Sequence, residues 1–277
     1  MRKLLAANCS RMLKNKLFWL GTVAMLIFGI YLPVSHYANM QKYTFPMYID
    51  MGFFASGVFL MVIIAVFGGL FLGTEYSDGT IRNKLIIGQK RPVIYFANLI
   101  TLSIAGTIMN AVWIVTYLCV GLPLLGGFQM ELEKIFLFSV CIELLIIVFA
   151  SIFTMIAMIN HKKAASSVIC LLCAFALMIA SFFITSKLSE AETISGYTYT
   201  DDSGEVITQE AKPNPRYLKG IERDVYEFLN DFLPGNQALG ISNLTVEEPC
   251  WLMLYSGMII LVTTCSGHIV FRRKDIK

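Results

Sequence analysis

The stretch GTEYSDGTIRNKLIIGQKRP, residues 73–92, is a polar segment between two long apolar runs. Ser77 or Asp78 can cap the start of a short helix, because their side-chain oxygens accept hydrogen bonds from free first-turn N–H groups. Gly88 favours the left-handed conformation that ends a helix, and Pro92 prevents its continuation. The apolar residues that fall near one face at helical spacing are Ile81, Leu85 and Ile86. The stretch therefore predicts a short capped helix, and the alternative is a solvated loop that only sets membrane topology.

The composition is that of a membrane protein. Of 277 residues, 56% are hydrophobic and only 15% are charged, with a mean hydropathy of +0.66. Soluble domains contain about 25% charged residues. The chain contains six apolar runs, at residues 17–34, 51–73, 93–120, 135–159, 164–185 and 250–271. Each run is long enough, or nearly long enough, to cross a membrane as a helix. We predict an all-α polytopic membrane protein with six transmembrane helices.

These runs divide the chain into three parts. Residues 1–185 hold an N-terminal helix and the first five spans, residues 186–249 form an insertion, and residues 250–277 hold the sixth span and a basic tail. In the insertion, aromatic and β-branched residues alternate on both sides of DDSG, which predicts a β-hairpin. An amphipathic helix is then expected from Tyr217 until Pro234 ends it. The insertion is therefore expected to be a small α+β unit.

Residues 1–16 predict an amphipathic helix that lies on the membrane surface. Its apolar side on a helical wheel holds Leu4, Leu5, Cys9, Met12 and Leu13. The opposite side holds Lys3, Arg11 and Lys14. A basic topology signal without fixed structure is the alternative, and we expect no cleaved signal peptide.

Lysine and arginine are distributed unequally between the two sides of the predicted spans. With the N-terminus inside, the inner connections hold fifteen of these residues and the outer ones seven, although the outer ones are longer. Acidic residues show the reverse bias, with fifteen outside and three inside. By the positive-inside rule we expect a bacterial plasma-membrane protein with both termini in the cytoplasm and residues 186–249 outside the cell.

Catalytic and cofactor motifs are missing from the sequence. It contains no GxxxxGK[ST], HExxH, GxSxG or paired CxxC motif. Its basic residues are split among short membrane-flanking segments, so they form no nucleic-acid footprint. We therefore expect neither an enzyme nor a bound cofactor, metal or nucleic acid.

Glu143 is an ionisable residue within the fourth predicted span. A carboxylate in hydrocarbon is costly, so it is expected to face the bundle interior or to be protonated. Asn110 and Trp113 of the third span are expected at similar depth, where they could hydrogen-bond it. A substrate-path or gating role and an interhelical polar lock are the two interpretations, and both stay open.

Gly69 and Gly73 form a GxxxG pattern at the inner end of the second span. Small residues at this spacing allow two helices to approach closely. We expect the pair to pack against another helix of the same chain, and a dimer seam is the alternative.

The six spans, the basic N-terminal helix and a GxEY–xxGT–IR pattern together resemble the permease subunits of type-2 ABC exporters. The residues that carry the pattern are Gly73, Glu75, Tyr76, Gly79, Thr80, Ile81 and Arg82, followed by Lys90, Arg91 and Pro92. The closing FRRKDIK, residues 271–277, is similar to the ends of such permeases. Among them, the small permeases of bacterial peptide-antibiotic immunity and of drug or peptide export are the most similar.

This resemblance implies a division of labour between subunits. Residues 74–92 would form the coupling helix that docks on a separate cytoplasmic ATPase, which alone binds ATP and Mg²⁺. The coupling residues implied are Glu75, Tyr76, Gly79, Thr80, Ile81, Arg82, Lys84 and Leu85. A second permease chain, identical or homologous, would complete the transporter. Substituting Glu75 or Arg82 is expected to uncouple ATP hydrolysis from export without unfolding the membrane part.

The insertion is longer than the short re-entrant hairpins of such permeases, which suggests an added lid or partner-binding role. A membrane sensor that uses residues 186–249 to bind a ligand or partner, without transport, is the alternative function. It predicts no ATPase partner and a dispensable helix within residues 73–92.

Overall fold

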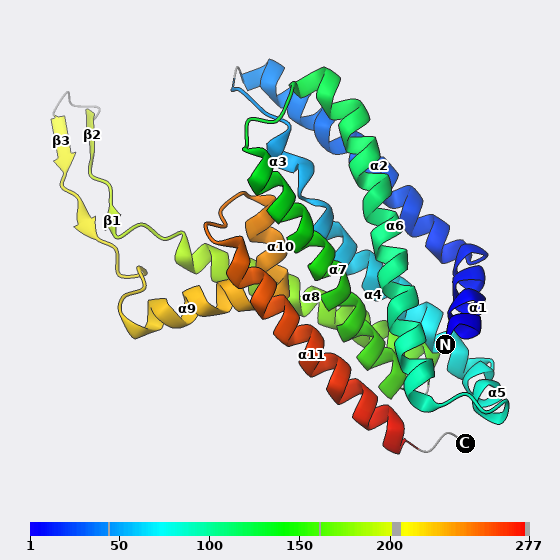
Figure 1. Ribbon diagram of the computed structural model, residues 1–277. Coiled ribbons are helices and arrows are strands. Elements are labelled where there is room, and N and C mark those ends of the chain that lie inside the picture. Colours follow the sequence, from blue (N-terminus) through cyan, green and yellow to red (C-terminus); the bar gives the residue numbers. More distant parts are fainter. Residues whose placement is uncertain (44, 161, 201–205, 275–277) are drawn as a thin grey trace.

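The computed structural model describes the whole chain except residues 44, 161, 201–205 and 275–277. For residues 197–209 it describes no side chains. Its helices run side by side as one bundle (Figure 1). Those long and apolar enough to cross a membrane are α2 (Lys16–Tyr43), α3 and α4 (Asp50–Phe53 and Ser56–Ser77, which together make one span), α6 (Arg91–Leu125), α7 (Leu132–Ile159), α8 (Lys163–Leu188) and α11 (Pro249–Arg273). The prediction of an all-α multi-pass membrane protein with six spans is confirmed.

Several spans are longer than their apolar runs. Helix α2 continues nine residues past the predicted end at residue 34 and carries Pro33 inside it. Helix α6 has 35 residues, which corresponds to about 52 Å, and it carries Pro123 near its far end. Hydropathy marks only the part of a helix that lies in hydrocarbon, so the polar ends of these helices were not predicted.

The two ends of the bundle differ in charge and in structure. Helices α1 (Arg2–Leu13) and α5 (Thr80–Ile86) lie at the end where α11 finishes, which we call the basic end. The insertion lies at the opposite end, which we call the acidic end (Figure 1). The predicted hairpin is confirmed as β2 (Tyr197–Thr200) paired antiparallel with β3 (Val206–Gln209), and β1 (Thr193–Ile194) pairs with β4 (Lys212–Pro213). The DDSG turn lies outside the described residues.

The insertion also contains a helix that the sequence did not predict. Helix α9 (Ile221–Phe232) matches the expected amphipathic helix and ends before Pro234, as predicted. Pro234 also occupies the first turn of a further helix, α10 (Pro234–Ser242), where its missing N–H costs no hydrogen bond. The first five residues of α10 are buried, and α10 contacts α4, α7 and α8. The insertion is therefore anchored in the bundle rather than standing wholly outside it.

The expected cap at the start of α5 is wrong in its details. Helix α4 continues through Ser77, and Gly79 with φ of 66° turns the chain before α5 begins. Neither Ser77 nor Asp78 caps α5 through its side chain. The C-terminal prediction is confirmed: Gly88 has φ of 86°, its N–H bonds the carbonyl of Leu85, and the Gln89 N–H bonds that of Lys84. These two bonds form a Schellman motif, and Pro92 then lies in the first turn of α6.

The central helix α4 packs closely on α8 through the predicted glycine pair. A Cβ atom at Gly69 would lie 2.7 Å from the Cα atom of Ser167, and one at Gly73 would lie 2.9 Å from that of Lys163. Both distances are shorter than real Cβ contacts. The pattern therefore packs within the chain, as expected.

We predict that Gly69→Ala destabilises the protein by about 1–3 kcal/mol, because the new methyl group overlaps backbone atoms of α8. The control is Gly257→Ala in α11, where an added Cβ meets no atom within 4 Å. That substitution should be neutral or slightly stabilising, since alanine favours a helix over glycine. Thermal unfolding of the purified variants in detergent measures both effects. Equal melting temperatures for the two variants would contradict close packing at Gly69.

Candidate functional site

A buried carboxylate ties four helices together at the basic end. The side chain of Glu75 on α4 has no exposed surface. Its Oε1 atom lies 2.6 Å from Nζ of Lys84 on α5 and 2.6 Å from Nη2 of Arg11 on α1. Its Oε2 atom accepts a hydrogen bond of 2.9 Å from Nδ2 of Asn98 on α6. A carboxylate can stay ionised in such a place because two cations and an amide replace its water.

A second amide completes this group. Asn8 of α1 is buried, donates to Oδ1 of Asn98 at 2.8 Å and accepts from Nζ of Lys84 at 3.1 Å. The guanidinium of Arg11 also lies over the ring of Phe71, 4.0 Å from its centroid. We call the set Glu75, Lys84, Arg11, Asn98 and Asn8 the Glu75 cluster. Burial lowers the pKa of Lys84, and the adjacent Glu75 carboxylate opposes that shift.

The sequence did not predict most of the Glu75 cluster. Arg11 was expected on the polar side of α1, but it turns inward to meet the carboxylate. The buried side of α1 is Leu4, Asn8 and Met12, whereas the expected apolar residue Leu13 is half exposed. Asn98, a polar residue inside an apolar run, was the one signal that could have indicated a buried polar partner.

The eight predicted coupling residues fall into different environments. Glu75 is fully buried, so we expect its substitution to affect stability as well as coupling. Ile81 is buried in one apolar cluster with Leu4, Tyr95 and Phe271. The half-buried residues are Tyr76, Gly79, Thr80, Lys84 and Leu85. Of the eight, only Arg82 is exposed.

The outer surface of α5 is partly apolar. Ile81, Leu85 and Ile86 were expected near one face, but Ile81 is buried whereas Ile86 is 73% exposed, and Ile87 after it is 79% exposed. Arg82 and Asn83 are also exposed. Helix α5 and the residue that follows it, Ile87, thus expose two isoleucines with an arginine and an amide nearby. Exposed apolar groups rimmed by polar ones are typical of a protein-binding surface.

Two basic residues fasten the neighbouring helix ends. Nη1 of Arg91 donates to the carbonyls of Phe271 and Arg272 at 3.1 and 3.0 Å, and also to that of Lys274. Nζ of Lys274 donates to the carbonyls of Ile159 and Met158 at 2.8 and 3.1 Å. The carbonyls at the last turns of α11 and α7 are thereby satisfied. Burial lowers the pKa of Lys274 to about 8.

Glu143 meets one of its two predicted partners. Asn110 donates to its Oε1 atom at 2.9 Å, as expected, and Thr107 donates to Oε2 at 2.9 Å. Trp113 was also expected to bond it, but its Nε1 atom donates to the Phe53 carbonyl at 2.9 Å. Thr107 takes its place because it lies one helical turn from Asn110 toward the basic end, on the same side of α6.

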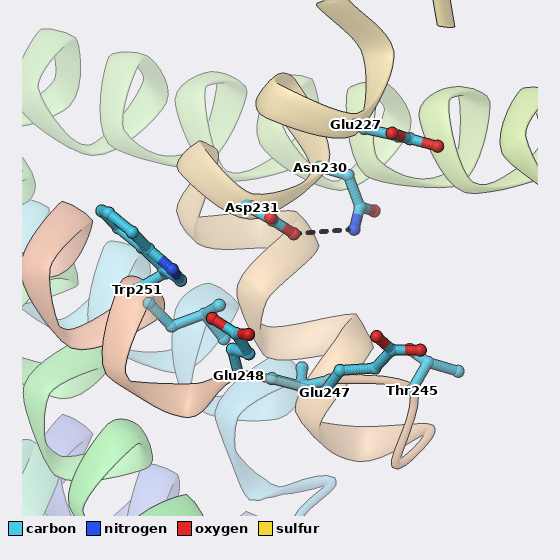
Figure 2. Close-up of a pocket in the computed structure, with 9 residues that line it drawn as sticks. Glu227, Asn230, Asp231, Thr245, Glu247, Glu248 and Trp251 are labelled. Carbon is cyan, nitrogen blue, oxygen red and sulfur yellow. Dashed lines mark hydrogen bonds between the residues drawn. The ribbon is translucent and has the colours of Figure 1, made fainter. Parts of the chain in front are cut away.

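A cavity of about 430 Å³ opens at the acidic end between α9 and the start of α11 (Figure 2). Its acidic lining residues are Glu227, Asp231, Glu247 and Glu248. Trp251 contributes an aromatic wall, and Asn230 donates to Asp231. Burial raises the pKa of Asp231. Among the described residues, no group of three or more His, Cys, Asp or Glu side chains is arranged to hold a metal ion.

We predict that Glu75→Gln lowers the free energy of unfolding by about 3 kcal/mol, because Lys84 and Arg11 lose their shared counter-ion. The double variant Glu75→Gln/Lys84→Gln should recover part of this loss, since one unpaired cation is removed with the carboxylate. The control is Glu227→Gln, which breaks an exposed pair with Arg223 and should cost under about 1 kcal/mol. Chemical denaturation of the solubilised variants measures each value. Strictly additive losses in the double variant would contradict the buried ion pair.

Comparison with known proteins gives one family. Residues 4–188 match the family described as ABC-2 family transporter protein. The matched region includes residues 4–13 of α1, the first five spans and the whole Glu75 cluster. No curated protein matches this chain closely enough to extend that finding.

Proposed function

The chain belongs to the ABC-2 transporter family, and from that premise we propose that it exports its substrate by alternating access, driven by a separate ATPase docked on α5. It is a membrane-embedded permease subunit of an ABC transporter. We further propose that ATP and Mg²⁺ bind only to the partner subunit and that a second permease chain, identical or homologous, completes the transporter. A peptide, a drug or a lipid-like molecule is the proposed substrate, by resemblance to antibiotic-immunity and drug-export permeases.

The proposed orientation in the membrane follows from the distribution of basic residues. The basic end carries most of the lysine and arginine of the connecting segments, which favours the cytoplasmic side of a bacterial plasma membrane. Both termini are then cytoplasmic, and residues 186–249 face the outside. This orientation puts α5 where a soluble ATPase can reach it.

The observation that carries the proposal is the two-sided character of α5. Its inner side is fixed by Ile81 and by the contact between Lys84 and Glu75. Its outer side exposes Ile86, Ile87 and Arg82. A partner that binds the outer side must therefore move the whole helix and, through the Glu75 cluster, α1, α4 and α6.

In the proposed cycle, ATP binding closes a pair of ATPase subunits and carries the two α5 helices with them. Because Gly88 and Pro92 end α5 and start α6 without a long linker, little of this displacement is lost in a flexible loop. The hydrogen bonds from Arg91 to the last turn of α11 transmit the displacement to that helix. The permease pair then opens outward and releases substrate.

A sensor without transport activity is the second candidate function. The acidic cavity at the other end of the bundle is the observation that favours it, because a large external cavity suits a ligand or partner (Figure 2). This alternative requires no ATPase and leaves the exposed isoleucines of α5 without a role. We therefore favour the permease as an active exporter.

We predict that an ATP-binding subunit co-purifies with the tagged chain from detergent-solubilised membranes and that Arg82→Glu or Ile87→Asp lowers its yield at least tenfold. The charge at Arg82 and the apolar surface at Ile87 are both lost from the exposed side of α5, while its buried side is unchanged. Quantitative mass spectrometry of the purified samples measures the yield.

The matched control is Lys134→Glu, which makes the same charge change on an exposed residue at the acidic end. It should leave the yield unchanged. If no ATPase co-purifies with the wild type, or if all three variants behave alike, docking on α5 is excluded and the sensor is favoured.

A further inference from the structure

Glu143 lies in a part of the bundle where a charge is unexpected. It is eleven residues from the outer end of α7, which places it about 17 Å along the helix, near the middle of the span. Both carboxylate oxygens accept hydrogen bonds from neutral donors, Thr107 and Asn110. Among the described residues, no lysine, arginine or histidine nitrogen lies within 4.0 Å of it. The carboxylate therefore has no cation of its own.

The amide oxygen of the neighbouring Asn110 has no hydrogen-bond partner within the described part of the chain. Asn110 is 2% exposed, and its Oδ1 atom accepts no hydrogen bond in the described structure. Asn110, Glu143 and Ser139 line a cavity of about 80 Å³, with space for roughly two or three groups the size of water. Buried acceptors are normally hydrogen-bonded, so this cavity suits a small group that carries several N–H or O–H donors.

An apolar groove approaches Glu143 from the basic end of the bundle. It has a volume of about 350 Å³ and runs along α6 from Leu99 to Ile108, with Ile147 of α7 on its other wall. Thr107 lines this groove and donates to Glu143, which lines the polar cavity, so one hydrogen bond joins the linings of the two. Thr107 is exposed, which means that the junction opens at the surface of the bundle.

From this juxtaposition we propose that the α6–α7 groove binds a cationic amphiphile, whose ammonium group contacts Glu143 and Oδ1 of Asn110 while its chain lies along Leu99–Ile108. A resident phospholipid does not satisfy this site, because its charged head stays at the membrane surface rather than near mid-span. A molecule on its way across the membrane does bring a charge to that depth. The inference rests on the proposed export function, and it defines the substrate class.

The test uses the full-length permease alone in phosphatidylcholine nanodiscs and a photoreactive analogue of dodecylamine. Adducts on residues 99–108 are quantified by mass spectrometry while dodecylamine, as its ammonium ion, or dodecanol competes. The two competitors share a chain and differ in the charged head. We expect dodecylamine to compete at a concentration at least tenfold lower than dodecanol does.

Glu143→Gln should abolish this tenfold difference, because the amide keeps the size of the side chain but removes its charge. The control Glu133→Gln neutralises an exposed acid at the start of α7 and should retain the full difference. Ile104→Trp fills the groove from its half-buried position and should reduce the adducts at least fivefold, so the proposal does not depend on one variant. Equal competition by both ligands in the wild type, or an unchanged preference in Glu143→Gln, would overturn the proposal.

No ATPase is present in this experiment, so its failure is distinct from failure of the proposed function. Loss of binding with an intact ATPase complex rejects the groove and keeps the exporter. Selective binding without any ATPase complex keeps the groove as a ligand site and rejects active export.

Discussion

The buried carboxylate of Glu75 is the constraint on which the basic end of the structure depends. An ionised group without exposed surface requires compensating charge, and here that charge comes from Lys84 and Arg11. The two cations belong to the short helices α5 and α1. The ion pairs with α4 add to the packing that holds these two helices in place. Asn98 connects the carboxylate to α6 by a hydrogen bond, and Asn8 of α1 donates to Asn98.

This arrangement explains how a helix of seven residues can act on a bundle of long ones. Helix α5 is too short to be stable alone, because helix nucleation is costly and isolated helices under about 12 residues are marginal in water. Its Schellman end, the buried Ile81 and the ion pair of Lys84 compensate for that weakness. Arg91 adds a direct contact with the carbonyls that end α11. The exposed side of α5 is thus free for a partner, while its inner side belongs to the bundle.

Hydropathy and turn chemistry predicted the six spans, the hairpin, the glycine packing and the end of α5, because each depends on local sequence. The cap at the start of α5 and the polar ends of α2 and α6 were missed locally, whereas the other misses depend on contacts between distant segments. Arg11 was placed toward solvent because its partner Glu75 is sixty-four residues away in sequence. Trp113 was predicted to hydrogen-bond Glu143 because the two lie at similar depth, but its indole N–H donates to the Phe53 carbonyl. Helix α10, which begins at Pro234, was not predicted because its burial depends on packing against α4, α7 and α8.

The most direct test of the central claim, that α5 is the docking helix for an ATPase, is site-specific photocrosslinking in intact cells. A photoreactive amino acid is placed at Ile87 on the exposed side of α5, or at Leu261 on the exposed apolar side of α11 as the control. We predict a covalent adduct between position 87 and a protein with a nucleotide-binding domain, and none from position 261. Adducts with such a protein from neither position, or equally from both, would contradict the account.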